Sequence, residues 1–200
     1  MLVIRAKGGL RRQDAEANIR AANGPKGARQ ESRVIQCLCF MTRAWLSLGS
    51  NVEPEKHLRT ALAELRARFG EVVVSPTYRF SAVGFGGAAF LNLAVGIDTD
   101  LDAIALNDWL HALEDHHGRR RDVPRYSDRT LDIDIVLFGN QVLRGPGNLE
   151  VPRAELKHAF VLKPLAEIAP DAVHPILHKS LAHMWREHRE HDTLFERVPL

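Results

Sequence analysis

The order of hydrophobic patterns between residues 44 and 138 is the feature that most restricts the fold of this chain. Strand-like runs, with alternating apolar or β-branched residues, occupy residues 44–48, 71–80, 91–99 and 131–138. Apolar residues at helical spacing predict helices at 58–69 and 106–113, after the first and third strands. The order β-α-β-β-α-β predicts an α+β, ferredoxin-like sandwich in which helices cover an antiparallel sheet.

Two further segments complete this outline. A turn is expected at Gly49-Ser50-Asn51, where Ser50 or Asn51 would cap the first helix. We expect the last third of the chain to form a C-terminal extension, with a helix around residues 180–188. The extension before that helix contains Pro152, Pro164, Pro170 and Pro175.

Residues 1–40 differ from the rest of the chain in charge. They hold eight Lys/Arg and three Asp/Glu, a net +5, so the other 19 basic and 22 acidic residues give −3. Both cysteines, Cys37 and Cys39, lie in the same segment. We expect residues 1–40 to be a disordered leader, with Met41 as the true start, and residues 41–200 to form a single domain. A transit peptide is the alternative, which the acidic residues of the leader disfavour.

The composition excludes several classes of protein. A content of 45% hydrophobic and 26% charged residues is that of a soluble globular protein. No apolar run approaches the ~20 residues that a membrane-spanning helix needs. The slightly acidic body argues against nucleic-acid binding, and its lack of cysteine fits a reducing compartment. We therefore expect a cytoplasmic protein, a monomer, without a membrane or nucleic-acid partner.

The run Leu131-Asp132-Ile133-Asp134-Ile135 carries the clearest chemical signal. A period of two puts Leu131, Ile133, Ile135 and Leu137 on one face of a strand, and Asp132, Asp134 and Val136 on the other. Two carboxylates about 6–7 Å apart on a partly apolar face repel each other and lose hydration. A magnesium ion would remove both costs, and two metals ~4 Å apart can share such a pair. The alternative is a pair of solvated surface acids.

The loop before this strand is rich in arginine. Five arginines lie within eleven residues: Arg119, Arg120, Arg121, Arg125 and Arg129. Arginine binds phosphate oxygens through paired N–H donors and keeps its charge, so arginines beside a carboxylate–metal site suit a polyphosphate. A solvated basic loop is the alternative. Together the two features predict phosphoryl or pyrophosphoryl transfer from a nucleotide, without a P-loop, since the chain has no G-x-x-x-x-G-K-[ST].

A series of ordered motifs extends this prediction along residues 44–172. They are Leu48-Gly49-Ser50-Asn51, Tyr78-Arg79, Phe90-Leu91-Asn92, Glu114 with Gly118, Arg119 and Arg121, Arg129-Thr130-Leu131-Asp132-Ile133-Asp134, Val151-Pro152, and Phe160-Val161-Leu162-Lys163-Pro164-Leu165 before Glu167-Ile168-Ala169-Pro170. In these motifs the chain resembles the 6-hydroxymethyl-7,8-dihydropterin pyrophosphokinase family of folate biosynthesis.

The resemblance implies a reaction and a set of roles. The family transfers pyrophosphate from ATP to the hydroxymethyl group of the pterin, giving AMP and the pterin diphosphate. It implies two Mg²⁺ ions on Asp132 and Asp134, and catalytic roles for Arg119, Arg121 and Arg129. Residues expected to bind ATP are Glu114, Arg119, Arg121, Arg129, Ile135 and Arg153. Residues expected to bind the pterin are Phe90, Asn92, Phe160 and Val83.

The chain departs from the family pattern at several positions. Tyr126-Ser127-Asp128 replaces a Trp and a Gly-Pro, and Phe80-Ser81 replaces a Thr-Pro. Arg153 stands where the family often has His, and His158 where it has Arg, so the two residue types look exchanged. These departures leave open a diverged paralogue with altered acceptor or lost activity. The expected fold leaves open a second alternative, a ferredoxin-like nucleic-acid-binding module, because such sheets also bind RNA.

Overall fold

The computed structural model describes residues 41–81, 87–119 and 127–200. Its strands are β1 (Thr42–Ser50), β2 (Val73–Val74), β3 (Thr77–Phe80), β4 (Phe90–Thr99), β5 (Asp132–Phe138), β6 (Leu143–Arg144), β7 (Glu150–Val151) and β8 (Arg197–Val198). Its helices are α1 (Pro54–Phe69), α2 (Ala103–His116), the 3-10 helix η1 (Ala154–Lys157), α3 (Ala159–Ile168) and α4 (Leu181–Arg186). The predicted order of elements is therefore confirmed.

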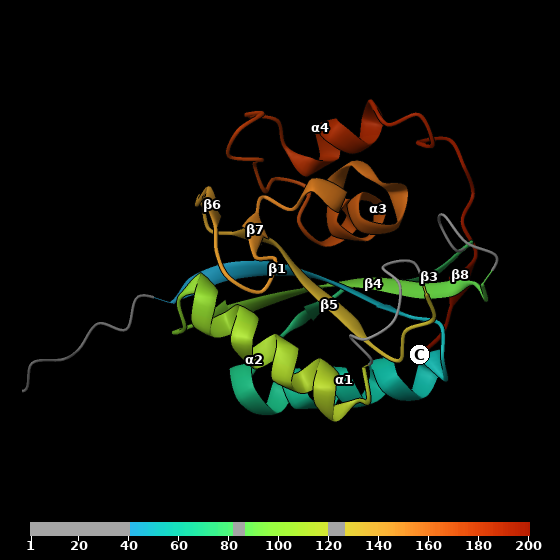
Figure 1. Ribbon diagram of the computed structural model, residues 1–200. Coiled ribbons are helices and arrows are strands. Elements are labelled where there is room, and N and C mark those ends of the chain that lie inside the picture. The colour runs from blue at the N-terminus through green and yellow to red at the C-terminus, as the bar shows by residue number, and fades with distance from the viewer. Residues whose placement is uncertain (1–40, 82–86, 120–126) are drawn as a thin grey trace, which may run out of the picture. The chain divides into compact units, whose positions relative to one another are not determined.

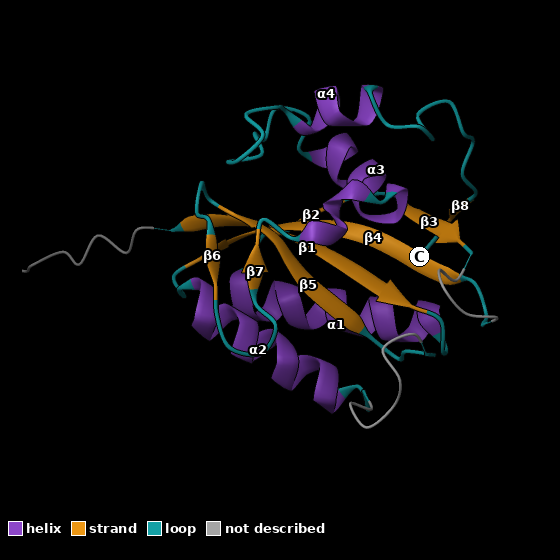
Figure 2. Ribbon diagram, turned by 45° about the horizontal axis from the view of Figure 1, so that its top comes forward, coloured by secondary structure: helices purple, strands orange, loops and turns teal. Residues whose placement is uncertain are grey.

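The main sheet has the strand order β5-β1-β4-β3-β8, and β2 also pairs with β4. All of these pairings are antiparallel (Figure 2). β6 and β7 form a separate two-stranded sheet. The predicted ferredoxin-like fold is confirmed, and the C-terminal strand β8 extends it at the β3 edge.

Helices cover both faces of this sheet. α1 and α2 lie on one face, and α3 and α4 lie over the other (Figure 1). The larger core fills the α1/α2 side and includes Leu46, Leu58 and Leu93, whereas Ala94 and Leu165 belong to a second cluster on the α3 side. Because adjacent residues of β4 enter different clusters, the sheet is buried from two sides. None of the helices in the described ranges has the length and apolar composition needed to cross a membrane.

The predicted strand 71–80 is divided by a bulge into β2 and β3. Val74 pairs with Val95, and Tyr78 pairs with Asn92. Between these two pairs, the segment from β2 to β3 contains one residue more than β4 does. Ser75, which precedes the proline at position 76, takes over the local hydrogen bonds. Its N–H donates to the Ala94 carbonyl at 3.0 Å, and its Oγ accepts from the Ala94 N–H at 2.9 Å. Proline lacks the N–H that an unbroken ladder would need.

The predicted cap of the first helix was wrong. α1 begins at Pro54 after Glu53, which makes no side-chain capping bond. Proline suits this first position, because its φ is already helical and its missing N–H would have had no helical partner. Ser50 and Asn51 lie in the preceding turn, and their side chains are used elsewhere.

The strict alternation predicted for residues 131–137 was wrong at its end. Ile135 lies opposite Leu46 but Leu137 lies opposite Trp45, so Val136 is an extra residue at a bulge. Ile135 belongs to the α1/α2 core, whereas both Val136 and Leu137 belong to the α3 cluster. The alternation holds through Asp132 and Asp134, where the chemical prediction depends on it.

Candidate active site

A cavity of about 1080 Å³ lies on the α3 side of the sheet and contains most of the predicted residues. The strands β1, β4 and β5 supply its floor, and the segment from β6 to α3 supplies one wall. Predicted residues that line it are Glu114, Arg119, Arg129, Asp132, Asp134, Arg153, Phe90, Asn92 and Phe160. Val83 and Arg121 lie outside the described residues, as do Arg120 and Arg125 of the arginine-rich loop.

Ile135 is the exception among the predicted residues that the structure describes. Its side chain is only 3% exposed and packs in the core between the sheet and α1/α2. It is not among the described residues that line the cavity. The structure therefore does not bring the Ile135 side chain together with the others.

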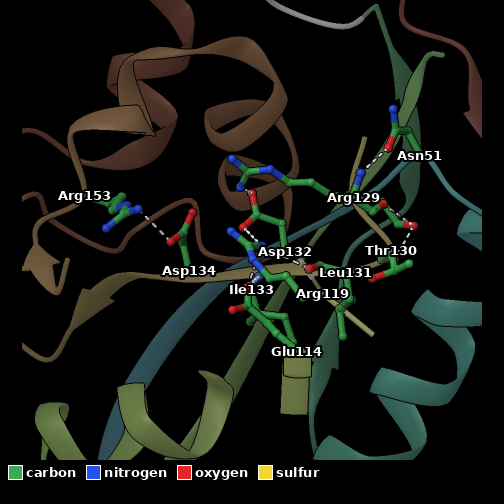
Figure 3. Close-up of polar contacts among 11 residues, drawn as sticks. Asn51, Glu114, Arg119, Arg129, Thr130, Leu131, Asp132, Ile133, Asp134 and Arg153 are labelled. Carbon is green, nitrogen blue, oxygen red and sulfur yellow. Dashed lines mark hydrogen bonds and ion pairs between the residues drawn. The ribbon is translucent and has the colours of Figure 1, made fainter. Parts of the chain in front are cut away.

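Asp132 lies between two arginines (Figure 3). Its Oδ1 accepts a short hydrogen bond from Nη1 of Arg119, and its Oδ2 accepts one at 2.5 Å from Nη1 of Arg129. Burial alone would raise the pKa of Asp132, but the charges and hydrogen bonds of Arg129 and Arg119 lower it below its usual value. Asp132 is therefore a carboxylate whose negative charge is stabilised at neutral pH.

Asp134 has a weaker set of partners. Nη2 of Arg153 lies 2.8 Å from its Oδ1. Burial, and next the negative charge of Asp132, raise the pKa of Asp134 to about 7, although Arg153 opposes this shift. The Asp134 side of the pair, with one arginine, therefore has less positive charge than the Asp132 side, with two.

This charge deficit fits a magnesium ion. Hard oxygen ligands suit Mg²⁺, which usually takes one or two protein carboxylates and completes its shell with substrate phosphates and water. Among residues 41–81, 87–119 and 127–200, no three His, Cys, Asp or Glu side chains gather as a metal cage. A pair of carboxylates beside arginines is thus suited to a metal that arrives with a polyphosphate rather than to a closed structural metal site.

Glu114 fixes the position of Arg119. It lies on α2 and is 2% exposed. Its Oε1 accepts from Nη1 of Arg119 at 2.9 Å and from the backbone N–H of Ile133 at 2.8 Å. The same Arg119 nitrogen donates to the Leu131 carbonyl at 3.0 Å. A buried carboxylate thereby joins α2, β5 and the first described arginine of the loop (Figure 3).

Ser50 and Asn51 hold the segment that carries Arg129, a role that the sequence analysis missed. Oδ1 of Asn51 accepts from the Arg129 N–H at 2.7 Å, and its Nδ2 donates to Oδ1 of Asp128 at 2.7 Å. Oγ of Ser50 donates to the Thr130 carbonyl at 2.6 Å. The signal was present in the motif Leu48-Gly49-Ser50-Asn51, but local sequence suggested a helix cap instead.

The other end of the cavity is aromatic. Phe90 and Asn92 lie two positions apart on β4, and Asn92 is 6% exposed. Gly49 faces this amide across the β1–β4 pair, where a Cβ would stand 2.9 Å from Oδ1 of Asn92. The absence of a side chain at Gly49 therefore leaves the Asn92 amide in place.

Phe160 lies in the first turn of α3, next to two rings that the sequence analysis did not assign to the site. The His158 ring stacks on it, with ring centroids 5.2 Å apart and planes 9° apart. Phe80 meets it edge to face at 6.3 Å and also lines the cavity. Burial, with the nearby charge of Lys157, lowers the pKa of His158, so this ring is neutral at physiological pH.

Comparisons with known proteins agree with this geometry. Residues 45–170 match the family model of 7,8-dihydro-6-hydroxymethylpterin-pyrophosphokinase (HPPK). The 2-amino-4-hydroxy-6-hydroxymethyldihydropteridine pyrophosphokinase of Pseudomonas aeruginosa is 42% identical over 138 residues, 66% of this chain and 83% of that protein. The Bacillus subtilis protein of the same name is 39% identical over 130 residues, 62% of this chain and 77% of that protein.

Solved structures support the fold. Two wild-type structures of Plasmodium falciparum HPPK-DHPS match with TM-scores of 0.58 and 0.59, at 14% and 12% identity. The matches cover 76% and 80% of this chain, but only 42% and 46% of the Plasmodium chains. This chain therefore spans less than half the length of those structures, and the likeness concerns the fold alone.

Proposed function

Since this chain belongs to the 7,8-dihydro-6-hydroxymethylpterin-pyrophosphokinase family, we propose that it transfers pyrophosphate from ATP to 6-hydroxymethyl-7,8-dihydropterin. The products are AMP and the pterin diphosphate, in folate biosynthesis. The observation that carries the proposal is one cavity with charged groups at one end and aromatic rings at the other. A polyphosphate fits the first end and a flat pterin ring fits the second.

At the charged end, Asp132 and Asp134 would hold Mg²⁺ in company with the ATP phosphates. The bound ion would withdraw charge from the phosphate oxygens and favour the ionised form of Asp134. Arg119, Arg129 and Arg153 already lie against the two carboxylates, so their guanidinium groups are in place to stabilise negative charge on the transferred group. Arg121 has the same proposed role on the strength of the family resemblance.

The transfer exchanges one phosphorus–oxygen bond for another. The hydroxymethyl oxygen of the pterin bonds to the β-phosphorus of ATP as the bond from that phosphorus to the α,β-bridging oxygen breaks. AMP leaves with the bridging oxygen, and the hydroxyl proton is released to solvent. Stabilisation of the charge on the phosphate oxygens and alignment of the two substrates are what the protein must supply. The arginines serve the first task, and the aromatic end serves the second.

At the aromatic end, Phe90 and Phe160 would stack on the pterin and Asn92 would recognise its polar edge. Stacking is favourable for any flat ring, so hydrogen bonds must distinguish the pterin from other heterocycles. Asn92 is suited to this task, because its amide offers both donors and an acceptor and is held in a buried position on β4. Val83 is proposed to contact the pterin by resemblance only.

The two alternatives find less support. A nucleic-acid-binding module would need an open sheet face, whereas helices cover both faces of this sheet. A paralogue without activity was suggested by Arg153 and His158, yet Arg153 lies 2.8 Å from Asp134 and restores a positive charge to the cavity.

We also propose that residues 41–200 form the catalytic domain, acting as a cytoplasmic monomer. The motifs and the cavity lie within this range, which contains no cysteine. A protein that begins at Met41 should keep the kcat and both KM values of the full chain within about twofold. Loss of activity on removal of residues 1–40 would contradict this assignment.

The reaction itself is tested with purified full-length protein, Mg²⁺, ATP and 6-hydroxymethyl-7,8-dihydropterin. Chromatography of the nucleotides should show AMP released in equal amount to the pterin diphosphate. Release of ADP would indicate transfer of a single phosphoryl group and would overturn the mechanism. A reaction without added pterin would indicate simple hydrolysis of ATP.

A further inference from the structure

The C-terminal strand β8 is an addition that the family match at residues 45–170 does not include. It pairs with the outer edge of β3, Thr77 with Val198 and Tyr78 with Arg197. The ladder continues with Arg79, whose N–H donates to the Glu196 carbonyl at 3.0 Å. β3 is thus held on one edge by β4 and on the other by the C-terminal segment.

One side chain of β8 also reaches α3. Nε of Arg197 donates to Oη of Tyr78 at 3.1 Å, and its Nη2 donates to Glu167 at 3.1 Å. Oη of Tyr78 donates to Glu167 at 2.8 Å, and Nζ of Lys163 lies 2.7 Å from the same carboxylate. The network joins β8, β3 and α3. Because the Arg197 side chain is 64% exposed, each of its own bonds is weak.

A row of rings makes a second, apolar link between the same elements. Phe195 lies just before β8, and Phe80 lies at the end of β3. The centroids of their rings are 4.8 Å apart. Phe80 in turn meets Phe160 on α3 edge to face at 6.3 Å. Phe80 and Phe160 line the cavity, whereas Phe195 is not among the described residues that line it. Phe195 also lies near the Trp185 ring of α4, at 6.3 Å between centroids, but its contact with a ring that lines the cavity is the one with Phe80.

The geometry points to Phe195, assisted by Arg197, as a positioning residue for the acceptor: the C-terminal segment sets where Phe80 and Phe160 stand at the aromatic end. This inference rests on the proposed function, in which Phe160 stacks on the pterin. A stacking surface binds the acceptor only while its rings stay in place, so the side chains that pack behind those rings matter. By the family resemblance, Phe80 stands where the family has Thr. This chain therefore has a larger, aromatic side chain at that position, and the Phe195 ring packs against it.

Phe195→Leu removes the ring and keeps most of the apolar volume. The KM for the pterin should rise on the order of 5-fold, the value expected when one aromatic contact is lost. The kcat and the KM for ATP should stay within about twofold, because Phe195 packs on the rings of Phe80 and Trp185 rather than beside Asp132 and its arginines. Phe195→Tyr should restore the pterin KM, since it returns the ring.

Two further variants make the test specific. Leu194→Ala, at a neighbouring side chain that is 99% exposed, is the matched control and should leave all constants unchanged. Arg197→Met leaves the rings in place and should raise the pterin KM about twofold, in keeping with weak, exposed bonds. This second variant keeps the inference testable if Phe195→Leu does not fold.

The outcomes separate the inference from the proposed function. A wild-type protein that does not transfer pyrophosphate to the pterin overturns both. An active wild type whose pterin KM is unchanged in Phe195→Leu overturns the positioning role alone. So does an equal rise in both KM values together with a lower melting temperature, because that result shows a general loss of structure.

Discussion

The two ends of the cavity are held in different ways. At the charged end, Arg119 contacts both Asp132 and Glu114, and each of these contacts is a hydrogen bond between opposite charges. At the aromatic end, Phe160 touches Phe80 and His158 through ring faces and edges, whose preferred geometry is much less strict. The charged end is therefore defined by short polar bonds, and the aromatic end by packing.

This difference suggests a division of labour. Charge-assisted hydrogen bonds fix a group in direction as well as in distance, which suits groups that must meet a phosphate in one geometry. Ring contacts tolerate small displacements, which suits a surface that binds a flat acceptor. Changes at the charged end should act mainly on kcat, and changes at the aromatic end mainly on the pterin KM.

The largest effect is expected from the carboxylates. Asp132→Asn and Asp134→Asn should each lower kcat by about 10³-fold or more, because an amide cannot replace a carboxylate as a magnesium ligand. Release of AMP by the purified variants measures this effect, and circular dichroism checks that they remain folded.

Asp98→Asn is the matched control for these two variants. Asp98 also lies on a strand of the sheet and is paired with an arginine, Arg43, at 2.8 Å, but it does not line the cavity. It should keep wild-type activity. Near-normal turnover in both Asp132→Asn and Asp134→Asn would refute the metal assignment.

A smaller loss is expected when the support of Arg129 is removed. Asn51→Ala deletes the bonds to the Arg129 N–H and to Asp128, so Arg129 is no longer fixed beside Asp132. Two partly buried hydrogen bonds are worth about 2 kcal/mol together, which corresponds to a fall in kcat of about 30-fold. Steady-state kinetics should show a pterin KM within about twofold of the wild type.

The exposed turn residue Asn140 provides the control for Asn51. Asn140→Ala removes the same amide at the surface and should leave kcat unchanged. If Asn51→Ala instead raised the pterin KM with kcat intact, the proposed division between the two ends would fail.

The aromatic end is tested by Phe160→Leu. Loss of the ring should raise the pterin KM roughly 10-fold while the KM for ATP stays within about twofold. Phe69→Leu is the control, because Phe69 packs edge to face on Trp109 at 5.0 Å, on the α1/α2 side of the sheet. It should lower the melting temperature and leave both KM values unchanged. A parallel rise of both KM values in Phe160→Leu would contradict the separation of the ends.

The two ends also differed in how far the sequence could predict them. The alternation of residues 131–135 and the nearby Arg129 are local, so the faces of Asp132 and Asp134 followed from the period of a strand. The order of strands and helices was predictable for the same reason. What the local pattern did not contain was the bulge at Val136, which moved Leu137 to the other cluster.

Contacts between distant segments account for the remaining misses. Asn51 bonds to Arg129, 78 positions away, and no local rule distinguishes that role from a helix cap. Phe80 and Phe195 meet only because β8 pairs with β3. The helix α3 was not predicted, and it contains Pro164, a residue that disfavours the interior of a helix. Predicting these features requires the tertiary fold.

The smallest expected effect concerns pH and a histidine pair beside the charged end. Nδ1 of His57 on α1 lies 2.9 Å from Nδ1 of His117, two residues before Arg119. Burial lowers the pKa of both rings below 6.5; the charge of His117 and then Lys56 add to the shift at His57, while Glu64 opposes it at His117. Glu53 and His116 are the other titratable neighbours.

A lowered pKa in the folded state has a definite consequence for stability. Folding favours the neutral rings, so their contribution is fully present above the unfolded pKa of about 6.5 and is lost as pH falls through the lower folded values. The free energy of unfolding, measured with urea, should therefore fall more between pH 7 and 5 in the wild type than in His57→Gln. His191→Gln, at an exposed ring that is not among the groups acting on either histidine of the pair, should keep the wild-type dependence. Equal pH dependence in His57→Gln and the wild type would show that the His57–His117 pair does not contribute to the pH dependence of stability.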